Sequence, residues 1–334
     1  MDVDRIKPFV LSTPKTLGEA TTLLAATLGA RVVAGGTDMI PSLRRGLRGA
    51  PKLVDLTGIP QLQNLSFAES GVTIGAGVTL ARLAAHEEVR RMLPIVAEAA
   101  ASVAGPGHRS VATLGGNLCL DTRCVYYNQS EWWRRANDYC LKHGGDTCHV
   151  APQGKHCHAA FSGDVAPALL VLGASIDIAG PQASRRVPLA SLYADDGAAH
   201  LTLAAGEILV CVAIPPQPRA ARSGYRKARA RGAIDFPLAG VAARVEMRDG
   251  RIASLRVALT GTNARPFLLE GTGDLVDRPL DEQLLARLGK LVQKQASPMR
   301  TTVTQSHYRR QVAAVLAQRL VRELADADAG RPDA

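Results

Sequence analysis

Apolar residues near the start of the chain recur at helical spacing, and strand-like runs follow them. The helical pattern comes after the capping pair Thr13-Pro14, ends at Gly29 and rests on five apolar positions: Leu17, Ala20, Leu23, Leu24 and Leu28. Short apolar runs then predict strands over 31–34 and 52–56. The glycine turn Gly35-Gly36-Thr37-Asp38 directly follows the first of them. This order predicts a small βαβ-like unit with a glycine turn at a strand end.

The next stretch predicts a hairpin and two helices. Apolar runs over 62–67 and 72–74 flank the turn Glu69-Ser70-Gly71, which is a hairpin signal. Alanine-rich helical patterns then cover about 79–86 and 88–103. Residues 112–114 lead into a second glycine turn, Gly115-Gly116-Asn117. Both glycine turns are therefore expected at the ends of strands.

The periodicity disappears between residues 119 and 161. This segment holds five of the six cysteines, both tryptophans, three of the six tyrosines and four of the eight histidines. Long aperiodic segments inside a compact domain are usually functional or disordered. Because cysteine and tryptophan are rare in disordered chains, we expect this segment to be ordered and functional.

Regular patterns return in the second half. Strand-like alternation covers 168–178 and 186–189, and Pro215-Pro216-Gln217-Pro218 is typical of a linker. After it come predicted strands near 225–230, 239–247 and 252–259 and helices at about 280–294 and 307–324. We therefore expect an α+β fold of two domains, 1–216 and 219–326. The aperiodic insertion, residues 120–161, lies in the first, and a disordered tail is expected over 327–334.

Composition and charge narrow the class of protein. No apolar run approaches the roughly 18 residues needed to cross a bilayer, and the N-terminus has no apolar signal segment, so we expect a cytoplasmic protein without a membrane partner. The net charge of +10 would suit an anionic partner. The basic residues are scattered, however, and aromatic residues make up only 4%. Nucleic acid is therefore not an expected partner.

The two glycine turns share a physical logic. Glycines let backbone amides approach a diphosphate closely, and Thr, Asp and Asn side chains can bind phosphate or ribose oxygens. Neither turn matches G-x-G-x-x-G or the P-loop pattern, so each taken alone is read most simply as a plain turn. Together, at two strand ends, they make a dinucleotide site plausible.

The insertion offers a candidate metal site. Its four candidate ligands are separated by 15, 7 and 8 residues: Cys124, Cys140, Cys148 and Cys157. Four thiolates fit a tetrahedral zinc ion or a cubane iron–sulfur cluster, but the C-x-x-C pairs common to both are absent. A redox-active pair and free structural thiols remain as alternatives. Cys119 and Cys211 lie in apolar contexts and are expected to be buried bystanders.

Two single residues outside these segments carry candidate roles. Asp164 follows Phe161-Ser162-Gly163 and could bind a ribityl chain or a flavin ring, or merely cap the next helix. Lys227 could face an anionic cofactor oxygen, although a lone lysine is usually a surface residue. No Ser/His/Asp or H-E-x-x-H arrangement suggests hydrolysis, so no catalytic acid–base residue is expected in this chain.

The segments 31–39 and 112–117 resemble the paired FAD diphosphate loops of the flavin subunits in the xanthine oxidase family of molybdenum enzymes. The resemblance covers nearly the whole chain. It implies an FAD-binding PCMH-type domain, with a small parallel βαβ subdomain and a larger mixed or antiparallel sheet, followed by an α+β domain like that of CO dehydrogenase flavoproteins. The FAD contacts it implies are Val32, Val33, Ala34, Gly35, Gly36, Thr37, Asp38, Met39, Val103, Thr113, Leu114, Gly115, Gly116, Asn117, Asp164 and Lys227.

The insertion itself resembles that of the flavin subunits of 4-hydroxybenzoyl-CoA reductases. The shared segments include Asp121-Thr122-Arg123-Cys124 and Tyr139-Cys140-Leu141-Lys142. This resemblance implies that Cys124, Cys140, Cys148 and Cys157 hold a [4Fe-4S] cluster. It also implies a heterohexamer with a molybdopterin-binding subunit and a [2Fe-2S] subunit, and ferredoxin as the electron donor.

The activity implied is an oxidoreductase that removes a phenolic hydroxyl reductively to give benzoyl-CoA, in anaerobic aromatic degradation. Two alternatives stand beside it. The first is an FAD subunit of an oxidative molybdenum hydroxylase or dehydrogenase of the same family. The second, from another class, is a zinc-stabilised binding module without redox activity.

Overall fold

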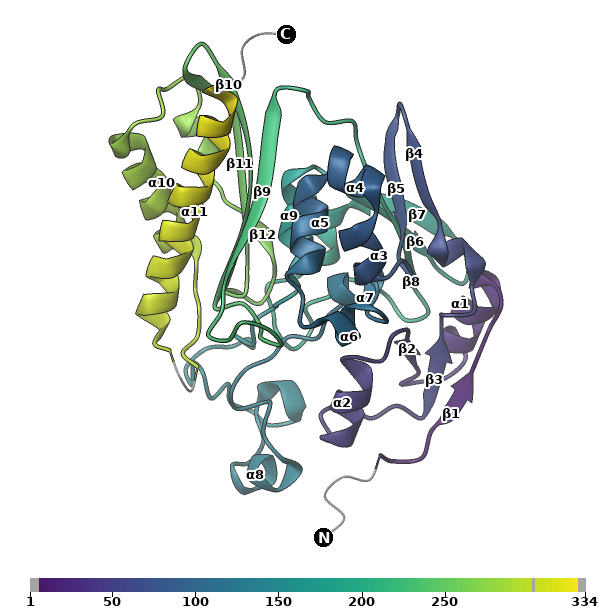
Figure 1. The fold of residues 1–334 in the computed structure, drawn as a ribbon. Helices are drawn as coiled ribbons and strands as arrows, with labels where there is room; N and C mark the ends of the chain where they lie inside the picture. The colour runs from purple at the N-terminus through teal and green to yellow at the C-terminus, as the bar shows by residue number, and fades with distance from the viewer. Residues whose placement is uncertain (1–5, 302–303, 330–334) are drawn as a thin grey trace.

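A computed structural model describes residues 6–301 and 304–329. It contains three sheets (Figure 1). A small parallel sheet and a larger antiparallel sheet belong to the N-terminal half, and a second antiparallel sheet with two long helices forms the C-terminal part. Figure 1 shows the insertion projecting from the body beside α2 (Met39–Arg44), on the side where its own helix α8 (Glu131–Ala136) lies.

The small sheet is the predicted unit with one additional strand. All three strands are parallel, in the order β1 (Val10–Ser12), β3 (Lys52–Asp55), β2 (Arg31–Val33). Helix α1 (Leu17–Ala25) begins after Thr16, whose hydroxyl accepts from the Glu19 amide at 3.2 Å. The expected cap at Thr13-Pro14 was wrong, because the helix starts later. Strand β1 gave no signal, since its apolar side chains are largely exposed.

The antiparallel sheet of the N-terminal half has five strands. Their order is β4 (Leu65–Ala68), β5 (Gly71–Gly75), β8 (Ile208–Ile214), β6 (Ser175–Ala179), β7 (Ser184–Pro188). The predicted hairpin is β4–β5, but residues 60–63 form a short 3-10 helix, η1 (Pro60–Gln63). The strand predicted over 168–178 was wrong in its first half, because residues 168–171 form the end of α9 (Val165–Val171). Every residue of α9 is buried, so its apolar run carries no period to separate helix from strand.

Helices between the sheets pack against the same core. They are α3 (Leu80–Ala85), α4 (Glu87–Met92), α5 (Pro94–Ala101) and α7 (Leu114–Leu118), whereas the short helix α6 (Pro106–Arg109) buries none of its residues. The single helix expected over 88–103 is divided at Pro94. Proline lacks the N–H that a continuing helix needs but suits a first helical position, so α5 starts there anew.

The C-terminal part has the predicted order of strands and helices. Its antiparallel sheet runs β12 (Phe267–Leu268), β11 (Arg251–Thr260), β10 (Ala239–Arg248), β9 (Ala221–Ala228). Helices α10 (Glu282–Gln295) and α11 (Ser306–Ala329) bury their apolar faces in its core. The tail expected from residue 327 is corrected for 327–329, which α11 includes; residues 330–334 lie outside the described part.

The insertion has little regular structure. Besides α8 it contains one 3-10 turn, η2 (Leu141–His143); two further 3-10 turns, η3 (Leu189–Leu192) and η4 (Thr272–Leu275), lie outside it. Arg123 and Ala160 close its neck by exchanging two backbone hydrogen bonds of 2.9 Å. None of the described helices has both the length and the apolar character required to span a bilayer.

Candidate functional site

The two glycine turns meet in space. We call residues 32–39 the first glycine loop and residues 113–117 the second. The first loop begins at the end of β2, where Val32 and Val33 pair with β3. It ends at Asp38 and Met39, where α2 begins. A Cβ placed on Gly35 would lie 2.0 Å from the carbonyl oxygen of Val111, just before the second loop. Only glycine permits this approach, so the fold brings together two turns that the sequence merely paired by type.

The first glycine loop offers backbone donors. Gly36 has φ +70°, a conformation that favours glycine. Within residues 6–301, the N–H groups of Gly35, Gly36 and Thr37 donate to no protein acceptor. Ala34 and these residues carry the chain from β2 into α2. Successive amides without protein partners suit an anionic group such as a diphosphate.

The second glycine loop is held by the protein. The Thr113 hydroxyl caps α7 by accepting from the Gly116 amide at 3.1 Å. The Gly115 amide donates to the Ala76 carbonyl at 2.7 Å, and Leu114 is fully buried. The Asn117 side chain accepts from the Val165 amide at 3.1 Å. These bonds fix the second loop against the core and against the start of α9.

Asp164 and Lys227 form a buried ion pair where the two predicted domains meet. The Lys227 ammonium donates to an Asp164 carboxylate oxygen at 2.9 Å and to the Ser102 carbonyl, next to Val103, at 3.1 Å. The Tyr225 hydroxyl donates to the other oxygen at 2.6 Å. Burial raises the pKa of Asp164, although Lys227 and Tyr225 oppose the shift. Neither residue is a lone surface group. Together they form a buried ionic contact between the two predicted domains.

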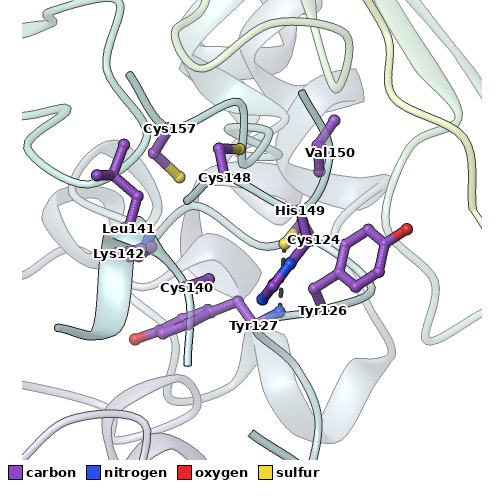
Figure 2. A pocket seen from close by; sticks show the side chains of 10 residues that line it. All are labelled: Cys124, Tyr126, Tyr127, Cys140, Leu141, Lys142, Cys148, His149, Val150 and Cys157. Atoms are coloured by element: carbon purple, nitrogen blue, oxygen red, sulfur yellow. Dashed lines mark hydrogen bonds between the residues drawn. The ribbon is translucent and has the colours of Figure 1, made fainter. Parts of the chain in front are cut away.

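The four cysteines of the insertion line one pocket. Figure 2 shows this cysteine pocket, with aromatic, aliphatic and basic side chains completing the wall: Tyr126, Tyr127, Leu141, Lys142, His149 and Val150. Cys140, Cys148 and Cys157 are buried, and Cys124 is half-buried. The cysteines are separated by 15, 7 and 8 residues in a segment with little regular structure, so the fold of the insertion brings the four thiols together.

Two of the thiols accept backbone hydrogen bonds. The Tyr127 amide donates to the Cys124 sulfur at 3.2 Å, and the Ala159 amide donates to the Cys157 sulfur at 3.4 Å. Burial raises the pKa of both thiols, that of Cys157 to about 12. Amides directed at sulfur favour thiolate over thiol, so these two bonds fit ligand sulfurs.

A largely buried charge network reaches the cysteine pocket through Lys142, which lines it. The Lys142 ammonium donates to Asp121 at 2.8 Å and to the Thr122 carbonyl at 2.7 Å, and Arg48 binds the same carboxylate from the N-terminal half. Burial acts to raise the pKa of Asp121, but Lys142 and Arg48 outweigh it and hold this pKa well below its usual range. Two cations and one carboxylate leave net positive charge beside the four sulfurs.

The four cysteines are a donor set that either a zinc ion or a cubane cluster could use. Within the described ranges, no three His, Cys, Asp or Glu side chains converge closely enough to hold one metal ion. A tetrahedral zinc site needs four donors around one point. In a cubane each thiolate binds a different iron atom, so the four sulfurs stand further apart around a larger space. Four cysteines around a common pocket fit that chemistry.

Sequence reasoning missed several residues of these sites. Tyr225 lies two positions before Lys227 on β9, so strand alternation places both side chains on one face, and this was the available signal. Arg48 and Lys142 gave none, because a basic residue is usually exposed. Of the aromatic pair, Trp132 is 70% exposed while Trp133 packs against Tyr126.

Comparison with known proteins decides the family. A family model described as the FAD binding domain in molybdopterin dehydrogenase matches residues 7–217. A second, the CO dehydrogenase flavoprotein C-terminal domain, matches residues 223–324. The chain belongs to the FAD-binding subunits of the xanthine oxidase family of molybdenum enzymes. The predicted fold class is confirmed, and this family member is an FAD-binding oxidoreductase subunit.

Relatives of the family match over most of their length. The putative xanthine dehydrogenase FAD-binding subunit XdhB of Escherichia coli (strain K12) is 27% identical, covering 95% of this chain and 96% of its own. The aldehyde oxidoreductase FAD-binding subunit PaoB of the same strain is 32% identical, covering 79% and 85%. Reconstituted CO dehydrogenase from Oligotropha carboxidovorans shares the fold, with TM-score 0.80 at 24% identity over 96% of this chain and 99% of that one.

Proposed function

We propose that this chain is the FAD and [4Fe-4S] electron-transfer subunit of a reductive molybdenum enzyme of the 4-hydroxybenzoyl-CoA reductase type. It would relay electrons from reduced ferredoxin towards the molybdenum site of a partner subunit, where the phenolic hydroxyl of 4-hydroxybenzoyl-CoA is removed to give benzoyl-CoA. Its partners would be the molybdopterin-binding and [2Fe-2S] subunits of a heterohexamer in the cytoplasm. FAD and the cluster supply the electron-carrying chemistry, and the chain supplies position, burial and charge.

The convergence of Cys124, Cys140, Cys148 and Cys157 on one pocket carries this proposal. Structural or bystander cysteines have no reason to gather from separate segments. Cys119, by contrast, lies outside the pocket, where burial raises its pKa to about 12, and Cys211 bonds Asp177 in the antiparallel sheet. The chain thus separates four candidate ligands from two bystanders.

The FAD contacts are proposed on the same chain. The unpartnered amides of the first glycine loop would receive the diphosphate, with the second loop packed behind them. Asp164 and Lys227 are polar groups buried between the two domains and would lie beside the flavin. Val103 follows Ser102, whose carbonyl binds Lys227, and so belongs to the same wall.

Anaerobic purification with flavin, iron and sulfide analysis tests the proposal. We expect about one FAD, four iron and four sulfide per chain, the composition of one flavin and one cubane. FAD without iron, or with zinc in its place, would contradict the cluster.

Replacing the cysteines one at a time by serine tests the ligand set. Each of the variants at 124, 140, 148 and 157 should lose most of the iron and retain FAD, whereas Cys119→Ser and Cys211→Ser should retain both. The measurement is iron and flavin content per folded chain. Full iron in all four ligand variants would rule out the assignment.

An oxidative FAD subunit is the second candidate. The relatives described above are a xanthine dehydrogenase subunit and an aldehyde oxidoreductase subunit, and this observation favours oxidation of substrate with electrons leaving through the flavin. Assay of the complete complex in both directions separates the two. Reduction of 4-hydroxybenzoyl-CoA by ferredoxin supports the reductive function. Oxidation of a substrate, with no reduction of 4-hydroxybenzoyl-CoA, supports the oxidative function.

A further inference from the structure

The insertion holds the segment that follows the first glycine loop along its whole length. We call residues 38–48 the α2 segment, since it consists of Asp38, α2 and the turn after it. Side chains of the insertion bond it at its start, middle and end: Arg123 binds Asp38 and Ser42, Asn128 binds Arg45, Arg134 binds the Arg45 and Gly46 carbonyls, Tyr127 binds the Leu47 carbonyl and Asp121 binds Arg48.

Arg123 contacts the end of the first glycine loop, at Asp38. Its Nη2 atom lies 2.6 Å from an Asp38 carboxylate oxygen and 2.7 Å from the Ser42 hydroxyl oxygen. The Ser42 hydroxyl in turn donates to the Asp38 carbonyl at 2.6 Å. The Arg123 side chain is 11% exposed and that of Asp38 is 30% exposed, so the ion pair is partly shielded from solvent. Its backbone closes the neck of the insertion, and the next residue is Cys124.

We propose that Arg123 is a positioning residue that couples the insertion to FAD binding. By fixing Asp38 and the first turn of α2, it holds the first glycine loop in the conformation that presents its amides to the cofactor. The inference rests on the assignment of residues 32–39 as an FAD loop. It adds that the insertion is a structural part of the FAD site besides carrying the cysteines.

The bonding pattern indicates how the insertion would change the affinity for FAD. Among the residues that the structure describes, no acceptor holds the loop amides of Gly35, Gly36 and Thr37, so their placement depends on the elements at either end, β2 and the α2 segment. Loosening the α2 segment would lower the fraction of chains with the loop in its binding conformation, and affinity falls with that fraction. Coupling is reciprocal, so bound FAD must also stabilise the insertion.

Titration of FAD-free chain with FAD, followed by flavin fluorescence, tests the inference. Arg123→Met should raise the FAD dissociation constant about tenfold, within the usual range of coupling between sites. Arg135→Met is the matched control, because Arg135 lies on the same insertion but is 74% exposed and contacts no residue of the α2 segment in the described structure. It should leave the dissociation constant unchanged.

Ser42→Ala removes the hydrogen bond between Arg123 and α2 from the α2 side. Ser42 lies outside the expected FAD contacts, yet its removal should weaken FAD binding, and the double variant with Arg123→Met should be less than additive. Additive effects, or no effect of Arg123→Met, would overturn the inference. Gly35→Ala serves as a separate test of the loop: unchanged affinity there would refute the FAD loop itself.

Hydrogen exchange keeps the test decisive if a variant folds poorly. In the unaltered chain, adding FAD should slow amide exchange within residues 123–160 as well as within 32–39. Protection confined to 32–39 would overturn the coupling while leaving the FAD loop intact. Protection of both segments, lost from 123–160 in Arg123→Met, would support it.

Discussion

His200 is a buried base in the N-terminal domain. It is 4% exposed, its Nε2 atom lies 2.9 Å from the Leu120 carbonyl oxygen, and its ring packs near Phe161. Burial lowers the pKa of His200 from 6.5 to about 4. Between pH 6.5 and about 4, His200 therefore stays neutral in the folded chain, whereas the same histidine is protonated in the unfolded chain.

The sign of the pH effect follows. Stability from the neutral His200 is complete above pH 6.5, is lost as the pH falls from 6.5 to about 4, and changes no further below. The loss amounts to about 3 kcal/mol. Urea unfolding at pH 7.5 and pH 4.5 should show this loss in the unaltered chain and much less of it in His200→Gln. His307→Gln, at an exposed position, should behave like the unaltered chain.

Lys142 places a buried positive charge beside the cysteine pocket, with its side chain 3% exposed. A nearby cation stabilises the reduced, more negative state of an iron–sulfur cluster. Lys142→Met should therefore shift the midpoint of the proposed cluster to a more negative potential, by about 60 mV for a tenfold change in a one-electron equilibrium. EPR-monitored redox titration measures it.

Lys155→Met is the control for this shift. It removes the same charge two residues from Cys157, but Lys155 is exposed and solvent screens its charge. Its midpoint should stay near that of the unaltered chain, and Lys142→Arg should restore the original value. Equal shifts at both lysines would show that total charge, rather than the buried network, sets the potential.

The close approach of Gly35 to Val111, two residues before the second glycine loop, gives a testable prediction. Gly35→Ala places a Cβ 2.0 Å from the Val111 carbonyl oxygen, so the loops must separate. The overpacking should cost about 1–3 kcal/mol of unfolding free energy and should strongly weaken FAD binding. Gly49→Ala, where a Cβ meets open space, should alter neither. Thermal unfolding and flavin content per chain give the two readouts.

The junction between the domains contains a buried ion pair besides its apolar contacts. Lys227→Met leaves the Asp164 carboxylate buried without its cation, which typically costs about 3–5 kcal/mol. Denaturant unfolding of FAD-free chain should show this loss. The double variant Lys227→Met with Asp164→Leu should recover most of it, because no unpaired charge remains. A single variant as stable as the unaltered chain would show that the pair contributes little to the junction.

Much of the element order could be predicted from the chain. Helix α10 has its apolar residues at clear helical spacing, and β10 and β11 alternate on either side of a turn, so local pattern was sufficient. Helix α9 and strand β1 show where it fails. A fully buried helix and an exposed edge strand both lack the one-sided apolar pattern on which such prediction depends.

Candidate site residues divide in the same way. The glycines and the four cysteines were visible as residue types with unusual spacing, and the resemblance to a family gave them roles. Strand alternation could have placed Tyr225 beside Lys227, but no local pattern marks Asp164, 61 residues away, as its partner. Arg123 gave no such signal, because nothing local pairs an arginine with Asp38, 85 residues away.

The sequence by itself determined the family, the two glycine turns, the cysteine-bearing insertion and most helices and strands. These depend on local propensity, periodicity and residue type, which act within a few turns of chain. The tertiary structure alone decided that the first glycine loop packs against Val111, just before the second, that four cysteines share one pocket, and that side chains of the insertion bind the α2 segment. Those contacts join residues distant along the chain, so they arise only when packing of the whole molecule fixes which surfaces meet.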